Sequence, residues 1–149
     1  MKDESKEMIE FRLARKSYGI DVLLVQEIIQ STTITPIPYA HPAITGIIQL
    51  RGEILPVIDF GRLWNNNDLH LNYTRFIVAK VKGHSVVFPV EEVNDIVRVS
   101  SEQIVEIEDV QDVKESFIIA EVLVGSKEAI KLVDFTKVLD TIQNHKNIA

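Results

Sequence analysis

The sequence predicts a mainly β protein made of two small barrels, with short helical pieces and an amphipathic helix near the C-terminal end. Short β-rich runs are separated by turn residues about every 8–12 positions, which is typical of small antiparallel barrels or sandwiches. The polar segment 65–68 divides these runs into two sets, which indicates two lobes. Helical periodicity dominates only after residue 134.

The first strands are predicted from the alternation of apolar and charged residues. The first helical turn is predicted from a cluster of apolar residues. Ile9, Phe11 and Leu13 alternate with charged residues, as in a half-buried strand, and residues 15–17 are expected to turn the chain. Apolar residues crowd together over residues 21–29, with positions 22, 25 and 29 on one helical face. We expect one or two helical turns that run into a strand.

A tight hairpin is predicted in the middle of the chain. The β-rich runs 44–50 and 54–59 are joined at 51–53, where Gly52 is the residue that freely adopts a positive φ. Pro56 lacks a backbone donor, so the second strand is expected to have an edge or a bulge. For the same reason, the proline-containing segment 35–38 is predicted to be a loop or an edge.

The second half repeats this style of short strands and turns. The expected elements are a hairpin of 73–81 and 85–90 about the turn 82–83, a strand over 93–99, an acidic loop over 106–115, and a pair of strands, 117–124 and 130–133, about residues 125–126. Ile96 and Val97 are predicted to be buried. Ser100 and Gln103 have the spacing of a capping box for a short helical turn.

The last predicted element is an amphipathic helix. Its apolar residues fall at positions i, i+3, i+4 and i+7, and they are Phe135, Val138, Leu139 and Ile142. Asp134 precedes them as a favourable N-cap. With 149 residues, we expect a single domain over 8–143, with a lobe boundary near 65–72 and flexible termini at 1–7 and 144–149.

Composition argues against several classes of function. The net charge of −6 gives no general attraction to nucleic acid or to anionic membranes. The beginning of the chain is polar and no apolar stretch approaches the ~20 residues of a membrane helix, so a cytoplasmic protein without membrane insertion is expected. Cysteine is absent, which removes thiolate chemistry and disulfides.

No pattern of catalytic or cofactor-binding residues stands out. The four histidines are scattered, without metal-ligand spacing, at positions 41, 70, 84 and 145. There is no phosphate-binding loop and no nucleophile motif, and the paired carboxylates at 91–92 and 108–109 fall in expected turns. We therefore expect no metal, no cofactor and no catalysis, and a function that depends on protein surfaces.

One constellation of motifs resembles a known family. It consists of YGID at 18–21, VQEI at 25–28, PIP at 36–38, GIIQLRGEILPVID at 46–59, VNDI at 93–96, SSEQI at 100–104 and LVD at 132–134. In order and spacing these motifs resemble the CheW family over nearly the whole chain. The chain departs from the family pattern at Gln49, where Asn is usual, and in lacking glycine at 14–17 and 118–121.

The resemblance implies a fold, a function and partners. The fold would be two intertwined five-stranded barrels around a shared hydrophobic core. The function would be that of a chemotaxis adaptor that joins the cytoplasmic tip of methyl-accepting chemoreceptors to the regulatory domain of the CheA histidine kinase, in receptor arrays at the inner face of the membrane. A CheV-like or kinase-regulatory-domain-like module is an alternative, and a small β-barrel enzyme is a third hypothesis.

The resemblance also implies a set of site residues. Positions linked to receptor or kinase coupling would be Val25, Glu27, Gly46, Arg51 and Ile77, with Gly52 as a structural turn residue. Each has a structural alternative. Val25 and Ile77 could be core residues, and Gly46 could serve a backbone bend. Arg51 could be merely solvated, or it could pair with Glu27 on the surface.

Overall fold

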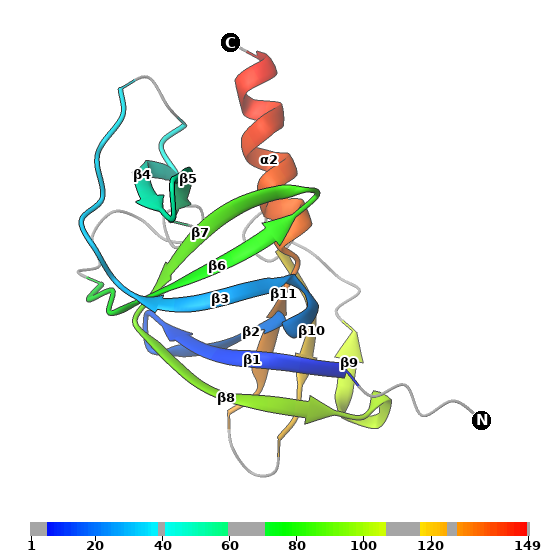
Figure 1. Cartoon of the computed structure of the whole chain (residues 1–149). Helices are drawn as coiled ribbons and strands as arrows, with labels where there is room; N and C mark the ends of the chain where they lie inside the picture. Colours follow the sequence, from blue (N-terminus) through cyan, green and yellow to red (C-terminus); the bar gives the residue numbers. More distant parts are fainter. Residues whose placement is uncertain (1–5, 39–40, 60–70, 107–116, 125–127, 149) are drawn as a thin grey trace.

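The described residues form two β-sheets, short 3-10 turns and a C-terminal α-helix (Figure 1). The structure is a computed structural model that describes residues 6–38, 41–59, 71–106, 117–124 and 128–148, with side chains described up to residue 143. Strands dominate every described part of the chain before the helix, so the predicted mainly β class is confirmed.

The first sheet has six strands. In spatial order they are β8 (Glu92–Val99), β1 (Lys6–Leu13), β2 (Lys16–Asp21), β11 (Ile130–Val133), β10 (Ile118–Val122) and β9 (Ile104–Glu106). The edge strands β8 and β9 are consecutive in the chain and are joined through the 3-10 helix η2 (Ser101–Gln103). The sheet therefore curves until its two edges meet at η2.

The second sheet has five strands. In spatial order they are β3 (Val25–Gln30), β6 (Arg75–Val81), β7 (His84–Val90), β5 (Glu53–Ile58) and β4 (Ile44–Leu50). The chain beyond β3 returns to the opposite edge, where Thr35 and Ile47 exchange backbone hydrogen bonds of 2.9 and 2.8 Å. This sheet also joins its own edges, and the segment around Thr35 is an edge piece as predicted.

The sheets interleave along the chain. β1 and β2 belong to the six-stranded sheet together with β8 to β11, while β3 to β7 form the other. Two neighbouring pairs, β2 with β11 and β5 with β7, are parallel, whereas the sequence predicted antiparallel barrels. Parallel neighbours require long connections. Between β2 and β11 the chain passes through β3 to β10, and between β5 and β7 it passes through β6.

A shared core lies between the two sheets. It contains Phe11 of β1, Ile77 of β6, Phe88 of β7 and Phe135 of the helix α2 (Phe135–Ile148). The ring centroids of Phe88 and Phe135 are 4.3 Å apart, and those of Phe11 and Phe135 are 6.3 Å apart. Each sheet alone would leave this apolar face exposed to water, so burial against the other sheet and α2 stabilises both.

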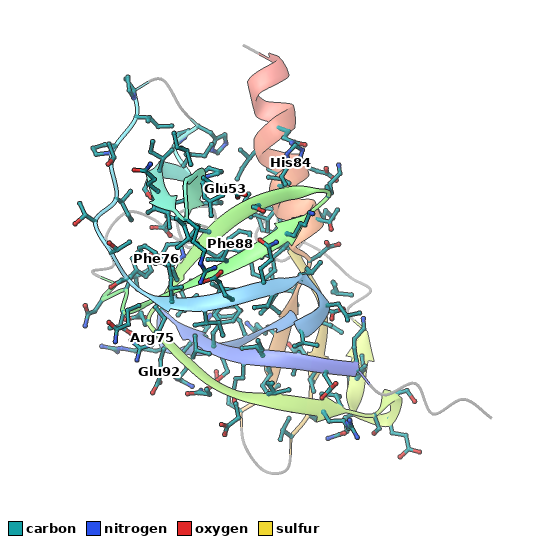
Figure 2. All side chains as sticks on the ribbon, viewed as in Figure 1. Glu53, Arg75, Phe76, His84, Phe88 and Glu92 are labelled. Atoms are coloured by element: carbon teal, nitrogen blue, oxygen red, sulfur yellow. The ribbon has the colours of Figure 1, made fainter. Side chains whose placement is uncertain are left out.

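The central strands of the five-stranded sheet are buried on both faces. Phe88 belongs to the shared core, whereas Phe76 belongs to a second cluster inside this sheet, with Ile48 and Val57 (Figure 2). Alternating side chains of a strand point to opposite faces, so a strand buried on both must be continuously apolar. This explains the uninterrupted buried run in β6.

The helical pieces agree with prediction. η1 (Val22–Leu24) is a single 3-10 turn that leads into β3, and the Asp21 carboxylate accepts a 3.0 Å hydrogen bond from the Leu23 amide. At the other end, the Asp134 carboxylate accepts a 3.1 Å bond from the Lys137 amide, as expected of an N-cap. The four predicted apolar positions of α2 are buried.

Three local expectations need correction. The first turn is at Ala14 and Arg15, because β2 already begins at Lys16. Ile96 is 59% exposed, since neighbours in a strand face opposite sides and Ile96 and Val97 cannot share one. Pro56 is on an interior strand, and the bulge lies in its partner β4. Its missing donor is tolerated because β5 pairs with β7 at only one position.

The expected domain boundaries can be compared with the strands only in part. β1 begins at Lys6, and α2 continues to Ile148. Residues 65–70 of the expected lobe boundary lie outside the described residues, and the strands on either side of it, β5 and β6, belong to one sheet. The expected acidic loop after 106 and the turn at 125–126 also lie outside the described residues.

Candidate functional site

Two of the predicted site residues meet as an ion pair. Glu27 is on β3, and Arg51 is in the turn between β4 and β5, and the Arg51 guanidinium donates to the Glu27 carboxylate. The Arg51 side chain is 72% exposed and that of Glu27 is 25% exposed. The predicted surface ion pair is confirmed. At this exposure it adds only ~0–1 kcal/mol to stability, so its main effect is to orient the two side chains.

The ion pair also joins the two edges of the five-stranded sheet. β3 and β4 are the edge strands, and they are separated by three other strands in the sheet. The Glu27–Arg51 pair and the Thr35–Ile47 bridge both span this seam. The Glu27–Arg51 pair therefore lies where the two edges of the sheet approach each other, and the backbone hydrogen bonds of Thr35 and Ile47 hold these edges together.

Gly46 lies in this seam, next to Ile47 of the Thr35–Ile47 bridge. A Cβ atom at this position would lie well inside van der Waals distance of the Thr35 carbonyl oxygen and of the Ile34 side chain. The residue is buried, so its role in this structure is to let two backbones approach. The surroundings of Gly46 therefore support the structural alternative, in which the glycine is needed for the backbone conformation.

The two apolar site residues are at different depths. Val25 is half-buried at the start of β3 and packs against the shared core. Ile77 has no exposed surface and lies fully inside that core, because β6 is buried on both faces. The placement of Ile77 on a coupling surface is therefore corrected, since its side chain offers no area for contact in this structure.

The turn that carries Arg51 has a defined backbone. Arg51 has a φ of 50° and Gly52 has a φ of 82°, which is the double positive φ of a two-residue type I′ hairpin turn. Gly52 has the positive φ expected of it, whereas the positive φ of Arg51 was not predicted, because arginine has no conformational preference for this region. The turn projects the Arg51 side chain into solvent from a rigid base.

Exposed apolar side chains occur a few positions along the chain from each member of the ion pair. Leu23 on η1 is 88% exposed and Ile54 on β5 is 65% exposed. Sequence reasoning did not single them out as site residues. Both could have been predicted to be exposed. Leu23 lies off the helical face formed by 22, 25 and 29, and Ile54 alternates with the buried Leu55.

The site has the chemistry of a contact surface. It offers the Glu27–Arg51 ion pair, and exposed aliphatic side chains occur on the adjoining segments of the chain. Among the described residues, there is no group of three or more His, Asp or Glu side chains that could hold a metal ion. Within the same part of the chain, no helix is long and apolar enough to cross a membrane.

Comparison with known proteins identifies relatives of this chain. The model of the CheW-like domain family matches residues 7–143. A chemotaxis protein CheW of Rhizobium meliloti is 34% identical over 100 residues, covering 66% of this chain and 64% of that protein. A CheW of Bacillus subtilis is 33% identical over 100 residues, with the same two coverages. The matched part thus amounts to slightly less than two thirds of these relatives.

A solved structure supports the same assignment. The scaffolding protein TtCheW from Thermoanaerobacter tengcongensis is 26% identical to this chain, with a TM-score of 0.77, over 86% of this chain and 88% of that one. Both sheets and most of the described chain are therefore matched in three dimensions. The resemblance predicted from the hairpin motif is confirmed, and the chain belongs to the CheW-like domain family.

Proposed function

We propose that this protein is a chemotaxis signal-transduction adaptor, which couples chemoreceptors to a CheA histidine kinase and catalyses no reaction. The observation that carries this proposal is the family match over residues 7–143, together with the likeness to a scaffolding protein across both sheets. An adaptor acts by holding two partners together, so that the conformation of one biases the equilibrium of the other.

The coupling surface in this proposal is centred on the Glu27–Arg51 pair. Arg51 and Glu27 provide oriented charge, and Val25 contributes its exposed part. Gly46 and Ile77 would act indirectly. Gly46 would permit the close backbone approach at the seam, and Ile77 would pack in the core that supports this surface. The partners would be the cytoplasmic tip of a chemoreceptor and the regulatory domain of the kinase, so the adaptor would work in the cytoplasm, at receptor arrays.

Replacing Arg51 by alanine tests the proposal. The side chain is exposed, and alanine keeps a Cβ at the same positive φ, so the free energy of unfolding should change by no more than ~0.5 kcal/mol. Coupling should weaken by ~1–3 kcal/mol, as for an interface hot spot. The measurements are thermal melting and receptor-dependent kinase stimulation in a reconstituted assay.

Two variants control this experiment. Arg98 is a matched exposed arginine, with 74% of its side chain accessible and an ion pair to Glu7, and Arg98→Ala should leave coupling unchanged. Gly52→Val forces a β-branched residue to a φ of 82° and should lower the melting temperature together with coupling. Normal kinase coupling by Arg51→Ala would remove Arg51 from the surface, and failure of the wild-type chain to couple any receptor to a kinase would reject the adaptor function.

A further inference from the structure

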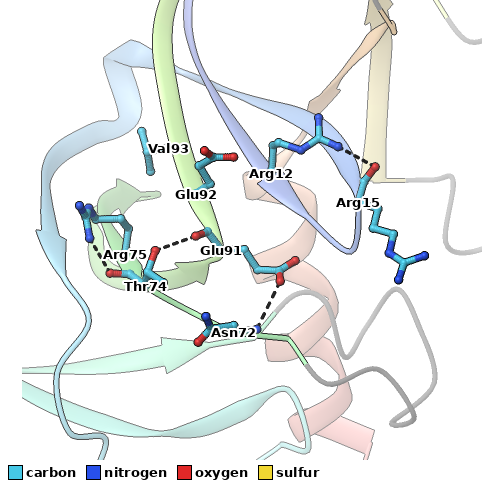
Figure 3. A pocket seen from close by; sticks show the side chains of 8 residues that line it. All are labelled: Arg12, Arg15, Asn72, Thr74, Arg75, Glu91, Glu92 and Val93. Carbon is cyan, nitrogen blue, oxygen red and sulfur yellow. Dashed lines mark hydrogen bonds between the residues drawn. The ribbon is translucent and has the colours of Figure 1, made fainter.

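A second surface feature lies where the two sheets cross over. It is a hollow of ≈ 620 Å³ (Figure 3). Charged side chains from both sheets dominate its lining, and they are Arg12, Arg15, Arg75, Glu91 and Glu92. Three positive and two negative groups leave a net local charge of one positive unit in a chain whose net charge is −6. The hollow is therefore a local exception to the acidic character of the protein.

Among the described residues, the Glu91 carboxylate forms no ion pair with these arginines. One of its oxygens accepts a 2.7 Å hydrogen bond from the Ala14 amide, and the other accepts a 3.3 Å bond from the Asn72 amide. The Thr74 hydroxyl donates to the Glu91 carbonyl oxygen at 2.6 Å. Glu91 thus connects the β1–β2 turn to the segment before β6, and its charge is directed at backbone donors.

Two of the guanidinium groups are held in place without an acidic partner. Arg12 donates to the Ser17 hydroxyl at 2.8 Å and to the Arg15 carbonyl at 2.9 Å, and Arg75 donates to the Thr74 carbonyl at 3.0 Å. Within the described residues, none of the ion pairs involves Arg12, Arg15 or Arg75. Each guanidinium has five N–H donors, so donors remain for a ligand, and pre-orientation lowers the entropic cost of binding.

We propose that this hollow binds an acidic segment of a protein partner, with Arg15 and Arg75 pairing with its carboxylates. The arginines come from β1, the β1–β2 turn and β6, so they suit single charges spaced along a peptide. Glu92 would repel a compact multivalent anion such as phosphate, but it can accept hydrogen bonds from peptide N–H groups. This inference rests on the proposed adaptor function, because the partner is one of the proteins that the adaptor joins.

The hollow and the Glu27–Arg51 site lie on opposite faces of the sheet at β3. Arg75 pairs with Gln30 of β3 in the sheet register, three residues beyond Glu27. At the rise of a β-strand this corresponds to about 10 Å along β3, and side chains an odd number of positions apart point to opposite faces. A partner that contacts both sites would therefore reach around the edge strand β3, with its extended acidic segment on the side of the hollow.

A peptide titration tests the proposal directly. The probe is hexaglutamate, added to the full chain at low salt, and the readout is the NMR shift of the arginine Nε–H groups and of the Ala14 and Asn72 amides. We expect saturable shifts confined to the hollow. The variant R15E/R75E should bind hexaglutamate about tenfold more weakly, and the binding should weaken as salt is added.

The control changes the same charge elsewhere. K80E/R98E also reverses two exposed positive side chains, outside the hollow, and should bind hexaglutamate as the wild type does apart from a small general charge effect. Thermal melting of both variants shows whether they remain folded. Absence of hollow shifts with hexaglutamate, equal weakening by both double variants, or saturation by inorganic phosphate but not by the peptide would each overturn the proposal.

A coupling assay separates this inference from the proposed function. In reconstituted receptor–kinase coupling, R15E/R75E should reduce coupling about as much as Arg51→Ala does. Normal coupling by R15E/R75E beside impaired coupling by Arg51→Ala would overturn the role of the hollow and leave the adaptor function standing. A wild-type chain that fails to couple would contradict the adaptor function, and the hexaglutamate titration would still decide whether the hollow binds acidic peptides.

Discussion

At the scale of single residues, close backbone contacts and buried polar groups determine what each position tolerates. Gly46 permits the approach of β4 to Thr35, and Gly52 permits a positive φ where no neighbour lies within 4 Å of an added Cβ. The two glycines are therefore required for different reasons, one steric and one conformational. Tyr18 presents a third case, a buried phenol stacked on Phe11 at 5.8 Å between ring centroids.

Gly46→Ala should destabilise the protein by ~1–3 kcal/mol, because the added methyl group would press on the backbone of Thr35, which cannot move without opening the seam. Denaturant unfolding measures the change. Gly52→Ala provides the comparison, with open space around it and a cost of ~1–2 kcal/mol that comes only from the left-handed backbone. Wild-type stability of Gly46→Ala would show that the seam is softer than the structure indicates.

Tyr18 predicts a loss of stability at high pH. Burial, with a smaller contribution from the nearby Glu128 carboxylate, raises the pKa of Tyr18 from 10.0 to about 12. The raised pKa means that the folded state favours the neutral phenol, so its contribution is complete below pH 10 and is lost as the pH rises towards 12. Denaturant unfolding across this range should show the decline.

The variant Tyr18→Phe removes the ionisable group and serves as the control for that measurement. Its stability should vary less with pH over the same interval, and a spectrophotometric titration should lose the phenol that ionises last. An identical decline in both proteins would assign the alkaline effect to other groups.

At the scale of secondary structure elements, short connectors close each sheet. In the six-stranded sheet this connector is η2, where the Gln103 side-chain oxygen accepts a 3.0 Å bond from the Ser100 amide. The Gln103 side-chain nitrogen donates to the Leu123 carbonyl at 3.1 Å, and the Leu123 amide donates to the Gln103 carbonyl at 2.9 Å. One side chain thus caps the helical turn and ties it to the end of β10.

Gln103→Ala should lower the free energy of unfolding by ~1–2 kcal/mol, because it leaves the Ser100 amide and the Leu123 carbonyl without this partner. Gln103→Glu separates the two bonds, since a carboxylate can accept from Ser100 but cannot donate to Leu123. Its cost should therefore be intermediate, as measured by denaturant unfolding near neutral pH. Equal stability of all three proteins would mean that η2 does not hold the edges together.

At the scale of the whole molecule, local patterns predicted the elements better than they predicted their assembly. The period of apolar residues in α2, the capping spacing of Ser100 and Gln103, and the turn at Gly52 depend on near neighbours and were all confirmed. Pairing of β2 with β11 and of β5 with β7 joins residues far apart in the chain, and no short-range pattern encodes it. The interleaved sheets could therefore be inferred only from the family resemblance.

In the candidate site, too, local features were predicted and features that depend on long-range assembly were not. Opposite charges and the hairpin motif were enough to predict the Glu27–Arg51 pair. The burial of Ile77 depends on β6 being covered on both faces, by the interior of its own sheet and by the shared core. The hollow of three arginines depends on elements that meet only after both sheets have formed, so the sequence held no local signal for it.

The shared core predicts that the two sheets unfold as one unit. Ile77, Phe88 and Phe135 pack in the same cluster as Phe11 of the six-stranded sheet, so loss of either sheet exposes the apolar face of the other. Ile77→Val should lower the free energy of unfolding by ~0.5–1.5 kcal/mol. Amide signals from β1 and from β4, followed by NMR through thermal unfolding, should therefore shift to the same lower midpoint.

The exposed Ile54 supplies the matched control, because Ile54→Val makes the same chemical change at a side chain that is 65% accessible, where the effect should stay within ~0.5 kcal/mol. If β1 kept its wild-type midpoint in Ile77→Val while β4 melted early, the sheets would be separate folding units.

The Ile77→Val variant also tests whether Ile77 is a core residue or a contact residue. A side chain that supports the coupling surface only through the core should lose kinase coupling in proportion to the unfolded fraction, whereas loss of coupling by a fully folded Ile77→Val protein would return Ile77 to the contact surface.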